Sequence, residues 1–420
     1  MIRLIEALNF RCLRYVRQPL GRFHVLVGPN ASGKTTFLDV VAFLGEMVTD
    51  GLEEALESRT RDFRDLLWRR EGEAFELAIE AEIPDERKAL LPPSAQFDTI
   101  RYEVRIGLIP NLGEVGILDE LAFLKQWKEE VSPVRPLFPM EPNPAKGILS
   151  KSGKQGVRRV LSKKFGGNDN FYSEVLEEGG KGWFPSIKLG PHKSALKNLP
   201  EDESRFPVST WLKKQLAQGV QRFMLDSLLM RRASPPGKIH GFKPDGSNLP
   251  WVVEELKQAD PGRFEQWILH LRTALPDIKD IRTVLREDDR HRYLIICYQG
   301  GLEVPSWMAS DGTLRLLALT LPAYLSGFRG VYLIEEPENG IHPRAVETLY
   351  QSLSSVYDAQ ILLATHSPVI LSAVSANDVL CFAKTNQGAT DIVRGTEHPA
   401  LKKWKGETNL GTLFAAGVLG

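Results

Sequence analysis

Short runs of apolar residues that end in polar or glycine-containing turns recur along this chain. Three of these runs predict buried strands, at Val25–Val27, Val331–Ile334 and Gln360–Ala364. The first run leads through a loop into a segment whose apolar residues recur at helical spacing, namely Phe37, Val40, Val41 and Leu44. We therefore expect a strand, a loop and then a helix that begins near Lys34.

Two further stretches alternate apolar and polar residues, which is the pattern of strands with one buried face. The apolar positions are Phe75, Leu77 and Ile79 in one stretch and Tyr102, Val104, Ile106 and Leu108 in the other. They predict an antiparallel β-layer, with Pro92 and Pro93 in the connecting loop. Later in the chain we expect a helical region over 208–230, a helix within DGSNLPWVVEELKQ and a strand over Tyr293–Tyr298.

Composition narrows the class of protein. The chain has 420 residues, of which 42% are hydrophobic, enough for one large α/β core with an inserted subdomain. Lys plus Arg and Asp plus Glu number 53 each, so net charge gives no reason to expect nucleic acid. Cys12, Cys297 and Cys381 are isolated, which argues against a disulfide framework and a zinc site. No apolar run is long enough to span a membrane, so we expect a cytoplasmic protein without a membrane partner.

The loop after the first strand carries the most specific motif. Gly28, Gly33, Lys34 and Thr35 match G-x-x-x-x-G-K-[ST] within the string GPNASGKTT. In this motif backbone N–H groups surround phosphates, the lysine reaches the outermost ones and the hydroxyl binds Mg²⁺. The following helix points the positive end of its dipole at the same phosphates. The motif therefore predicts that the chain binds ATP or a related nucleotide with Mg²⁺.

The second and third apolar strands end in residues suited to phosphate chemistry. Adjacent side chains at a strand end point in different directions, so we expect Glu335 near Mg²⁺ and Glu336 beside the attacking water. His366 follows the third strand, where its imidazole can form a hydrogen bond with a γ-phosphate. Ser310 and Gly312 open a predicted helix and form a further anion site, for a ligand of the same chain or of another one.

Taken in order, the strings GPNASGKTT, SDGT, LIEEPENG and ATHS resemble the ATPase head of the ABC superfamily, in the branch of SMC-type, RecF-type and OLD-type proteins. ENGIHP and the opening MIRLIEALNFRCL are most similar to OLD-like ATPases, many of which belong to antiphage defence systems. The resemblance covers roughly residues 1–48 and 240–375. It implies an α/β fold, a P-loop NTPase of ABC-ATPase type, with a mixed central sheet, an antiparallel β-layer and an inserted helical and loop subdomain.

The same resemblance implies further site residues. Arg11, Asn30 and Thr36 would join the phosphate loop at the nucleotide. Ser310 and Gly312 would form the signature that closes on ATP held by the opposite protomer of a homodimer. His366 would be the switch histidine.

Several positions depart from the family pattern. The signature reads SDGT in place of LSGGQ, and the acidic pair is Glu-Glu where Asp-Glu is commoner. Glutamate still reaches Mg²⁺ through water, so hydrolysis remains the expectation. No residue matches the Q-loop glutamine, for which Gln96 and Gln126 are candidates by position alone. His342 stands where many relatives carry the D-loop aspartate, and its role is open.

The motifs divide the chain into four segments. Residues 1–130 are expected to form lobe I, with the phosphate loop and the β-layer. Residues 131–206 form an insertion rich in Gly, Pro, Lys and Ser. Residues 207–385 form lobe II, with the helical region, the signature, the acidic pair and the histidine, and 386–420 form a C-terminal segment. No sustained heptad repeat predicts a long coiled coil.

The insertion contains a basic stretch from Lys146 to Lys164. It has seven cations and no acidic residue, and its glycines suggest a mobile loop: Lys146, Lys151, Lys154, Arg158, Arg159, Lys163 and Lys164. Such a loop suits the backbone of DNA or RNA. An acidic partner protein is the alternative.

We therefore expect an ATP-hydrolysing head that dimerises around ATP and drives a conformational change in antiphage defence or DNA maintenance. The chain after His366 is too short for the Toprim nuclease of OLD-type enzymes, so an effector, such as a nuclease, is expected to be a separate protein. The alternative is a scaffold that hydrolyses ATP slowly and releases a toxic partner. A transporter subunit is disfavoured by SDGT and the missing Q-loop.

Overall fold

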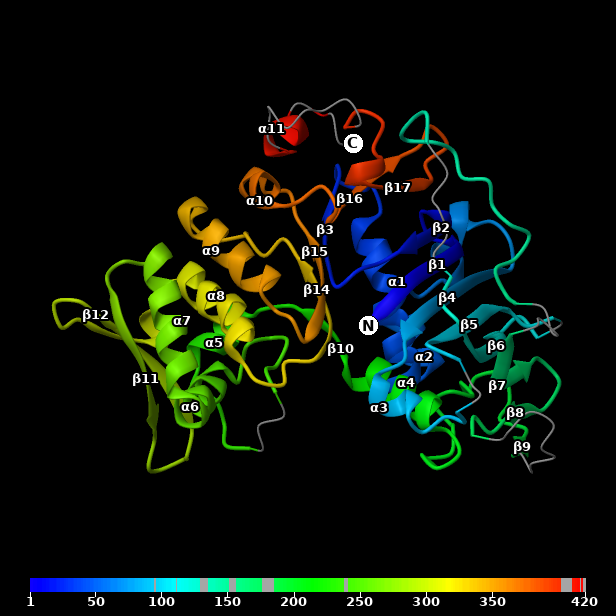
Figure 1. Ribbon diagram of the computed structural model, residues 1–420, viewed down its shortest axis with the longest axis horizontal. Coiled ribbons are helices and arrows are strands. Elements are labelled where there is room, and N and C mark those ends of the chain that lie inside the picture. The colour runs from blue at the N-terminus through cyan, green and yellow to red at the C-terminus, as the bar shows by residue number, and fades with distance from the viewer. Residues whose placement is uncertain are drawn as a thin grey trace.

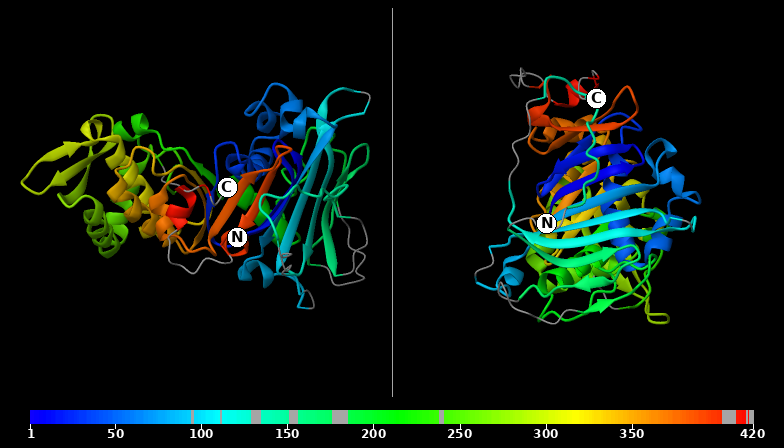
Figure 2. Two further views of the ribbon diagram at one scale, coloured as in Figure 1. Left: turned by 90° about the horizontal axis from the view of Figure 1, so that it is seen from above. Right: turned by 90° about the vertical axis from the view of Figure 1, so that its right-hand side faces the viewer.

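The computed structural model describes residues 1–93, 96–110, 112–128, 135–150, 156–175, 185–237, 241–401, 410–415 and 417. Its strands form three sheets (Figure 1). Figure 2 shows an elongated molecule, with an eight-stranded sheet at one end and a smaller sheet of three strands at the other. Among the described residues, none of the helices is both long and apolar enough to cross a membrane.

The central sheet is assembled from strands that lie far apart in the sequence. Its order is β10 (Val220–Phe223), β14 (Gly330–Glu335), β15 (Ala359–Ala364), β3 (Phe23–Val27), β16 (Val379–Lys384) and β17 (Thr390–Arg394). All neighbours are parallel except β16 and β17. The three strands expected from apolar runs are confirmed as β3, β14 and β15. Because the carboxyl ends of parallel strands share one edge, the loops that follow these strands meet there.

The eight-stranded sheet is antiparallel and forms the β-layer. Its order is β2 (Leu13–Pro19), β1 (Ile2–Phe10), β4 (Ala74–Glu82), β5 (Thr99–Leu108), β6 (Val115–Lys125), β7 (Val157–Lys164), β8 (Asp169–Phe171) and β9 (Ser186–Ile187). The two alternating stretches pair as expected, with Leu77 opposite Val104. A short helix, α3 (Asp85–Lys88), lies between them.

Most polar positions of β4 and β5 are buried as well, although Arg105 is exposed, so the expectation of one solvent-exposed face is wrong for most of their length. Arg101 forms ion pairs with Glu6, Glu80 and Glu103. A backbone segment that includes Ile148 covers the carboxylates, since its N–H donates to Glu76 at 2.6 Å. Charged residues remain buried here because each has a partner across the sheet or on the covering segment.

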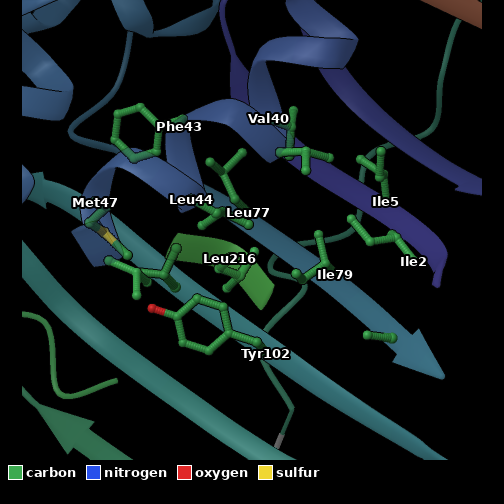
Figure 3. Packing of buried hydrophobic residues seen from close by; sticks show 14 of the residues in the cluster. Ile2, Ile5, Val40, Phe43, Leu44, Met47, Leu77, Ile79, Tyr102 and Leu216 are labelled. Carbon is green, nitrogen blue, oxygen red and sulfur yellow. The ribbon is translucent and has the colours of Figure 1, made fainter. Parts of the chain in front are cut away.

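Helix α1 (Lys34–Thr49) lies between the central sheet and the β-layer, and its predicted start at Lys34 is confirmed. Figure 3 shows its apolar side chains against those of the β-layer and of α4 (Pro207–Gln218), namely Val40, Phe43, Leu44, Met47, Leu77, Ile79, Tyr102 and Leu216. Each large buried side chain contributes roughly 1.5–3 kcal/mol. Burial on both sides therefore fixes the helix and the loop that precedes it.

A second core covers the other face of the central sheet. Its helices are α6 (Leu249–Ala259), α7 (Pro261–Ala274), α8 (Asp311–Thr320), α9 (Pro343–Ser354) and α10 (Pro368–Ala373). They pack with the third sheet, β11 (Ile278–Leu285), β12 (Arg292–Tyr298) and β13 (Glu303–Pro305). The remaining elements are α2 (Leu52–Glu57), α5 (Ser227–Arg231), α11 (Leu410–Ala415) and 3₁₀ turns at Phe63–Leu66, Trp68–Arg70, Ser306–Met308, Leu321–Tyr324 and Gly395–Glu397.

The helical region expected over 208–230 is wrong in its middle. Helix α4 ends before Gly219, strand β10 follows, and only then does α5 begin. A Cβ on Gly330 would lie 2.3 Å from the Gly219 carbonyl oxygen, so the two chain segments approach through glycine backbone. Parallel pairing of Val220 with Val331 outweighs the helical pattern of the local sequence.

The segment boundaries expected from the sequence do not follow the sheets. Strands β7 to β9 continue the β-layer, so 131–206 is in part an extension of that sheet. The expectation of a loop is wrong for Val157–Lys164, because β7 pairs with β6 over this range. The β16–β17 hairpin crosses the boundary at residue 385 and belongs to the central sheet.

His24 makes the fold sensitive to acid. The ring is buried at the start of β3 and accepts a hydrogen bond from Gly21 N–H at 2.7 Å. Burial lowers the pKa of His24 to about 4. A histidine in the unfolded chain titrates near 6.5, so the unfolded chain binds the proton first. The stability is complete above about pH 6.5 and is lost as the pH falls towards 4, by about 2 kcal/mol between pH 7 and pH 5.

Denaturant titrations at pH 7 and pH 5 measure this loss. His24→Gln should show a smaller difference in unfolding free energy between the two pH values than the wild type. The matched control is His192→Gln, since His192 is exposed and pairs with Glu114 at the surface. Equal pH dependence in all three proteins would contradict the assignment.

Candidate functional site

The phosphate loop has a shape that only glycine permits at its two ends. A Cβ on Gly28 would lie 2.1 Å from the Phe382 carbonyl oxygen, and one on Gly33 would lie 2.1 Å from Thr390 Oγ1. Gly33 is also left-handed, with φ of 102°, at the N-cap of α1. The β16–β17 hairpin therefore supports the loop from behind, and the N–H groups at the start of α1 face outward.

Lys34 and Thr35 start the helix and point to different partners. Lys34 Nζ donates to the carbonyl oxygens of Gly28 at 2.7 Å and Pro29 at 3.0 Å, so the amine lies across the loop. Burial lowers the pKa of Lys34, while the neighbouring Glu336 and Glu335 raise it. The Thr35 hydroxyl donates to the Glu335 carboxylate. The phosphate loop and the acidic strand end are thus in direct contact.

The two carboxylates that end β14 diverge, as the sequence predicts. Glu335 faces Thr35 with one oxygen and forms an ion pair with Arg222, at the end of β10, with the other. Glu336 is exposed and has a left-handed backbone with φ of 45°. Its N–H donates to the Ala364 carbonyl oxygen at 2.8 Å, which ties the turn to the end of β15.

The turn after the acidic pair positions its neighbours. Glu338 Oε1 accepts hydrogen bonds from Thr365 Oγ1 at 2.6 Å and from His366 N–H at 3.0 Å. Asn339 Nδ2 donates to Glu336 Oε2 at 2.6 Å. Burial, with the charge of Lys34 as a second cause, lowers the pKa of His366 and favours the neutral imidazole. The histidine therefore lies on a backbone that Glu338 holds in place.

A cavity of about 650 Å³ opens at this edge of the central sheet. Nine of the residues expected from the sequence line it, and they are Arg11, Asn30, Gly33, Lys34, Thr35, Thr36, Glu335, Glu336 and His366. Gly28 lies directly beneath, as the carbonyl partner of Lys34. The structure thus brings the loop after β3 together with the ends of β14 and β15, and Thr35 and Glu335 are in contact although 300 residues separate them in the sequence.

The rim of the cavity contains residues that sequence reasoning missed. Trp68, Arg69 and Arg70 come from a 3₁₀ turn, and Lys384 and Gln387 come from the β16–β17 hairpin. Arg69 lies over the Trp68 ring at 5.3 Å and donates to the Gln387 carbonyl oxygen at 2.7 Å. A flat ring among cations suits a nucleobase and its phosphates. No motif marks this turn in the sequence; its place at the cavity depends on contacts across the fold.

The signature lies outside this cavity. Ser310 caps α8, since its Oγ accepts a hydrogen bond from Thr313 N–H at 3.1 Å. Neither Ser310 nor Gly312 lines the cavity of its own chain.

His342, whose role the sequence leaves open, caps α9 by accepting a hydrogen bond from Arg344 N–H. Gln96, which precedes β5, and Gln126, which follows β6, form a hydrogen bond with each other and do not line the cavity.

The oxygen atoms beside the phosphate loop are suitable ligands for Mg²⁺. This ion prefers oxygen ligands and keeps several waters and phosphate oxygens. The Thr35 hydroxyl and the Glu335 carboxylate provide two such oxygens in mutual contact, beside the cavity. Thr35 would hold the ion directly and Glu335 would hold one of its waters.

The basic stretch of the insertion is less available than its sequence suggests. Lys163 is buried and donates to Asp169 at 2.8 Å and to the Gly190 carbonyl oxygen at 2.7 Å. Arg158 donates to the Glu174 carbonyl oxygen. Lys151 and Lys154 lie outside the described residues. The expectation of one mobile cationic loop is therefore wrong for its second half, because these residues form β7, where Arg158 and Lys163 are paired and Lys164 is exposed.

Comparisons with known proteins agree with this architecture. Residues 23–136 and 157–372 match the family described as "AAA domain, putative AbiEii toxin, Type IV TA system". The structure is similar to an SMC head bound to the C-winged helix domain of ScpA, with a TM-score of 0.53 and 12% identity over 93% of this chain and 97% of that one.

A second similar structure is an SMC head with an extended coiled coil, bound to the C-terminal domain of ScpA and derived from Pyrococcus furiosus. Its TM-score is 0.51 and its identity 13%, over 93% of this chain and 95% of that one. A search of curated proteins found no match. At such low identity the structural likeness establishes the fold alone.

Proposed function

The chain belongs to the AAA-domain family that it matches and has the fold of an SMC-like ATPase head of the ABC superfamily; from this premise we propose that it binds ATP with Mg²⁺ and hydrolyses it to ADP and phosphate. One observation carries the proposal. Lys34, Thr35, Glu335, Glu336 and His366 reach one cavity from three neighbouring strand ends. This is the set that phosphoryl transfer to water requires: a phosphate cradle, a metal carboxylate, a base and a γ-phosphate partner.

The proposed mechanism assigns one task to each group. The N–H groups at the start of α1 and Lys34 hold the phosphates. Bound Mg²⁺ supplies charge neutralisation at the phosphate oxygens. Glu336 orients the attacking water and accepts its proton as the oxygen attacks the γ-phosphorus and the bond to ADP breaks. Neutral His366 donates a hydrogen bond to the γ-phosphate. The Trp68 ring would lie against the adenine of ATP.

The signature supports a composite site. Ser310 is exposed and lies outside the cavity of its own chain, so its helix N-terminus is free to face phosphates of a second copy. We therefore assign Ser310 and Gly312 to ATP bound by the opposite protomer of a homodimer. Closing and opening of this dimer would convert hydrolysis into motion.

A partner protein would receive that motion. Both SMC heads named above were solved with a ScpA domain bound, which supports a separate effector for this chain. From the family resemblance we propose that the chain acts in antiphage defence or DNA maintenance, in the cytoplasm.

The alternative is a scaffold that holds a toxic partner and hydrolyses ATP slowly. The ion pair between Arg222 and Glu335 favours this alternative, because it occupies one oxygen of the carboxylate that we assign to Mg²⁺.

ATP turnover and ATP binding, measured on the same protein, test the proposal. We expect calorimetric binding of ATP with Mg²⁺ and steady-state phosphate release at roughly 1 s⁻¹ or faster for an enzyme. Tight binding with release slower by several powers of ten would support the scaffold. Absence of binding would contradict both. Turnover with and without DNA shows whether nucleic acid takes part.

A further inference from the structure

The Glu336 carboxylate has a dedicated partner in its own turn. Asn339 Nδ2 donates to Glu336 Oε2 at 2.6 Å, and Asn339 N–H donates to the Glu336 carbonyl oxygen at 3.0 Å. Two hydrogen bonds thus close a loop between these residues. An exposed glutamate would otherwise sample several rotamers, and a base that must align a water loses rate when it does.

The same turn touches the signature of the same chain. A Cβ on Gly312 would lie 2.4 Å from the Gly340 carbonyl oxygen, so glycine alone allows the first turn of α8 to rest on this backbone. Gly340 is left-handed, with φ of 77°, and directly follows Asn339. The Gly312–Gly340 contact and the Asn339–Glu336 hydrogen bond therefore connect the signature to the catalytic carboxylate.

A cleft of about 790 Å³ opens where these elements meet. It is lined from the signature helix by Asp311 and Arg315 and from the catalytic turn by Glu335, Glu336 and Asn339. Arg315 Cδ would lie 3.9 Å from a Cβ on Gly340, and its guanidinium donates to the Leu225 carbonyl oxygen at 3.3 Å. The start of α8 and the turn of Glu336 are thus two walls of one cleft, and they are in contact through Gly312 and Gly340.

We propose that Asn339 is a positioning residue that aligns Glu336, and that the Gly312–Gly340 contact links this alignment to the signature turn of the same chain. The inference rests on the proposed function, in which the signature closes on the partner's ATP. Closure displaces Ser310 and Gly312, Gly340 follows because the backbones are in contact, and Asn339 carries Glu336 with it. Each protomer thereby prepares its own base when it engages the other protomer's nucleotide.

The first test separates positioning from mere packing. Asn339→Ala should lower kcat about 10- to 100-fold while the Kd for ATP stays within about twofold. Asn339→Asp has the same size but lacks the donor and adds a like charge beside Glu336. We expect kcat of the aspartate variant to lie below that of the alanine variant, whereas a residue that only fills space would be rescued by aspartate.

The controls keep this result interpretable. Asn377→Ala changes an exposed asparagine of another loop and should leave kcat unchanged. Circular dichroism and the Kd for ATP show whether each variant is folded. Wild-type kcat in both Asn339 variants would overturn the inference and leave the proposed function intact. Absence of turnover in the wild type would instead count against the proposed function.

The second test is a double-mutant cycle on kcat. Gly312→Ala places a methyl against the Gly340 carbonyl and should displace the turn. If Gly312 acts through Asn339, the double variant with Asn339→Ala should lose less than the product of the two single fold-losses. A loss equal to that product would overturn the link. If Gly312→Ala does not fold, the Asn339 variants still decide the positioning role.

Discussion

Glu336→Gln is expected to bind ATP as the wild type does and to hydrolyse it roughly a thousandfold more slowly or worse. The amide keeps the shape of the side chain and its contact with Asn339 but cannot accept the proton of the attacking water. Because ATP then persists, the variant should accumulate as a closed dimer. Phosphate release and light scattering after size-exclusion chromatography measure the two effects.

Two companion variants check the assignment of the pair. Glu335→Gln should raise the Mg²⁺ concentration needed for activity, since this carboxylate contacts Thr35. Glu347→Gln changes an exposed glutamate on α9 and should have no effect. If Glu336→Gln hydrolysed ATP normally while Glu335→Gln did not, the division of labour within the pair would be reversed.

Lys34→Ala is expected to weaken ATP binding by at least about a hundredfold without unfolding the protein. A charge-assisted hydrogen bond contributes roughly 1.5–3 kcal/mol, and the amine keeps its third N–H donor for a phosphate oxygen. Lys34 Nζ also bridges the carbonyl oxygens of Gly28 and Pro29, so its loss loosens the loop as well. Calorimetric titration with ATP measures the affinity, and thermal melting monitors the fold.

A lysine far from the cavity is the matched control. Lys214 lies exposed on α4 and pairs with Glu203, so Lys214→Ala should keep wild-type affinity. A Lys34→Ala protein with wild-type affinity for ATP would refute the phosphate-loop assignment.

The sequence predicts the parts of the fold and site that depend on local patterns. Nearly continuous apolar runs reveal β3, β14 and β15, because strands buried on both faces are mostly apolar; His24 and Gln360 are the buried polar exceptions in β3 and β15. The residues that follow them are recognised because phosphate chemistry restricts both residue type and spacing. These predictions cover Lys34, the acidic pair and His366.

The parts that escape prediction depend on contacts between distant segments. Strand β10 reads as helix because its pairing partner lies in β14, and Arg101 reads as solvent-exposed because the covering segment around Ile148 follows much later in the chain. No motif marks Trp68, which reaches the cavity through a 3₁₀ turn, and the ENGIHP string contains Asn339 without indicating its hydrogen bond to Glu336. In each case the deciding partner is invisible to a local pattern.

The composite site is the central claim, and mixing two inactive variants tests it most directly. Ser310→Arg should bind ATP through its own Lys34 but stop turnover, because the arginine blocks the partner's nucleotide. A mixed dimer with Lys34→Ala combines an intact phosphate loop and an intact signature at one of its two sites. With subunit exchange confirmed by energy transfer between labelled protomers, we predict partial recovery of ATP turnover at protein concentrations where each variant alone is silent. Full activity of Ser310→Arg on its own would contradict the account.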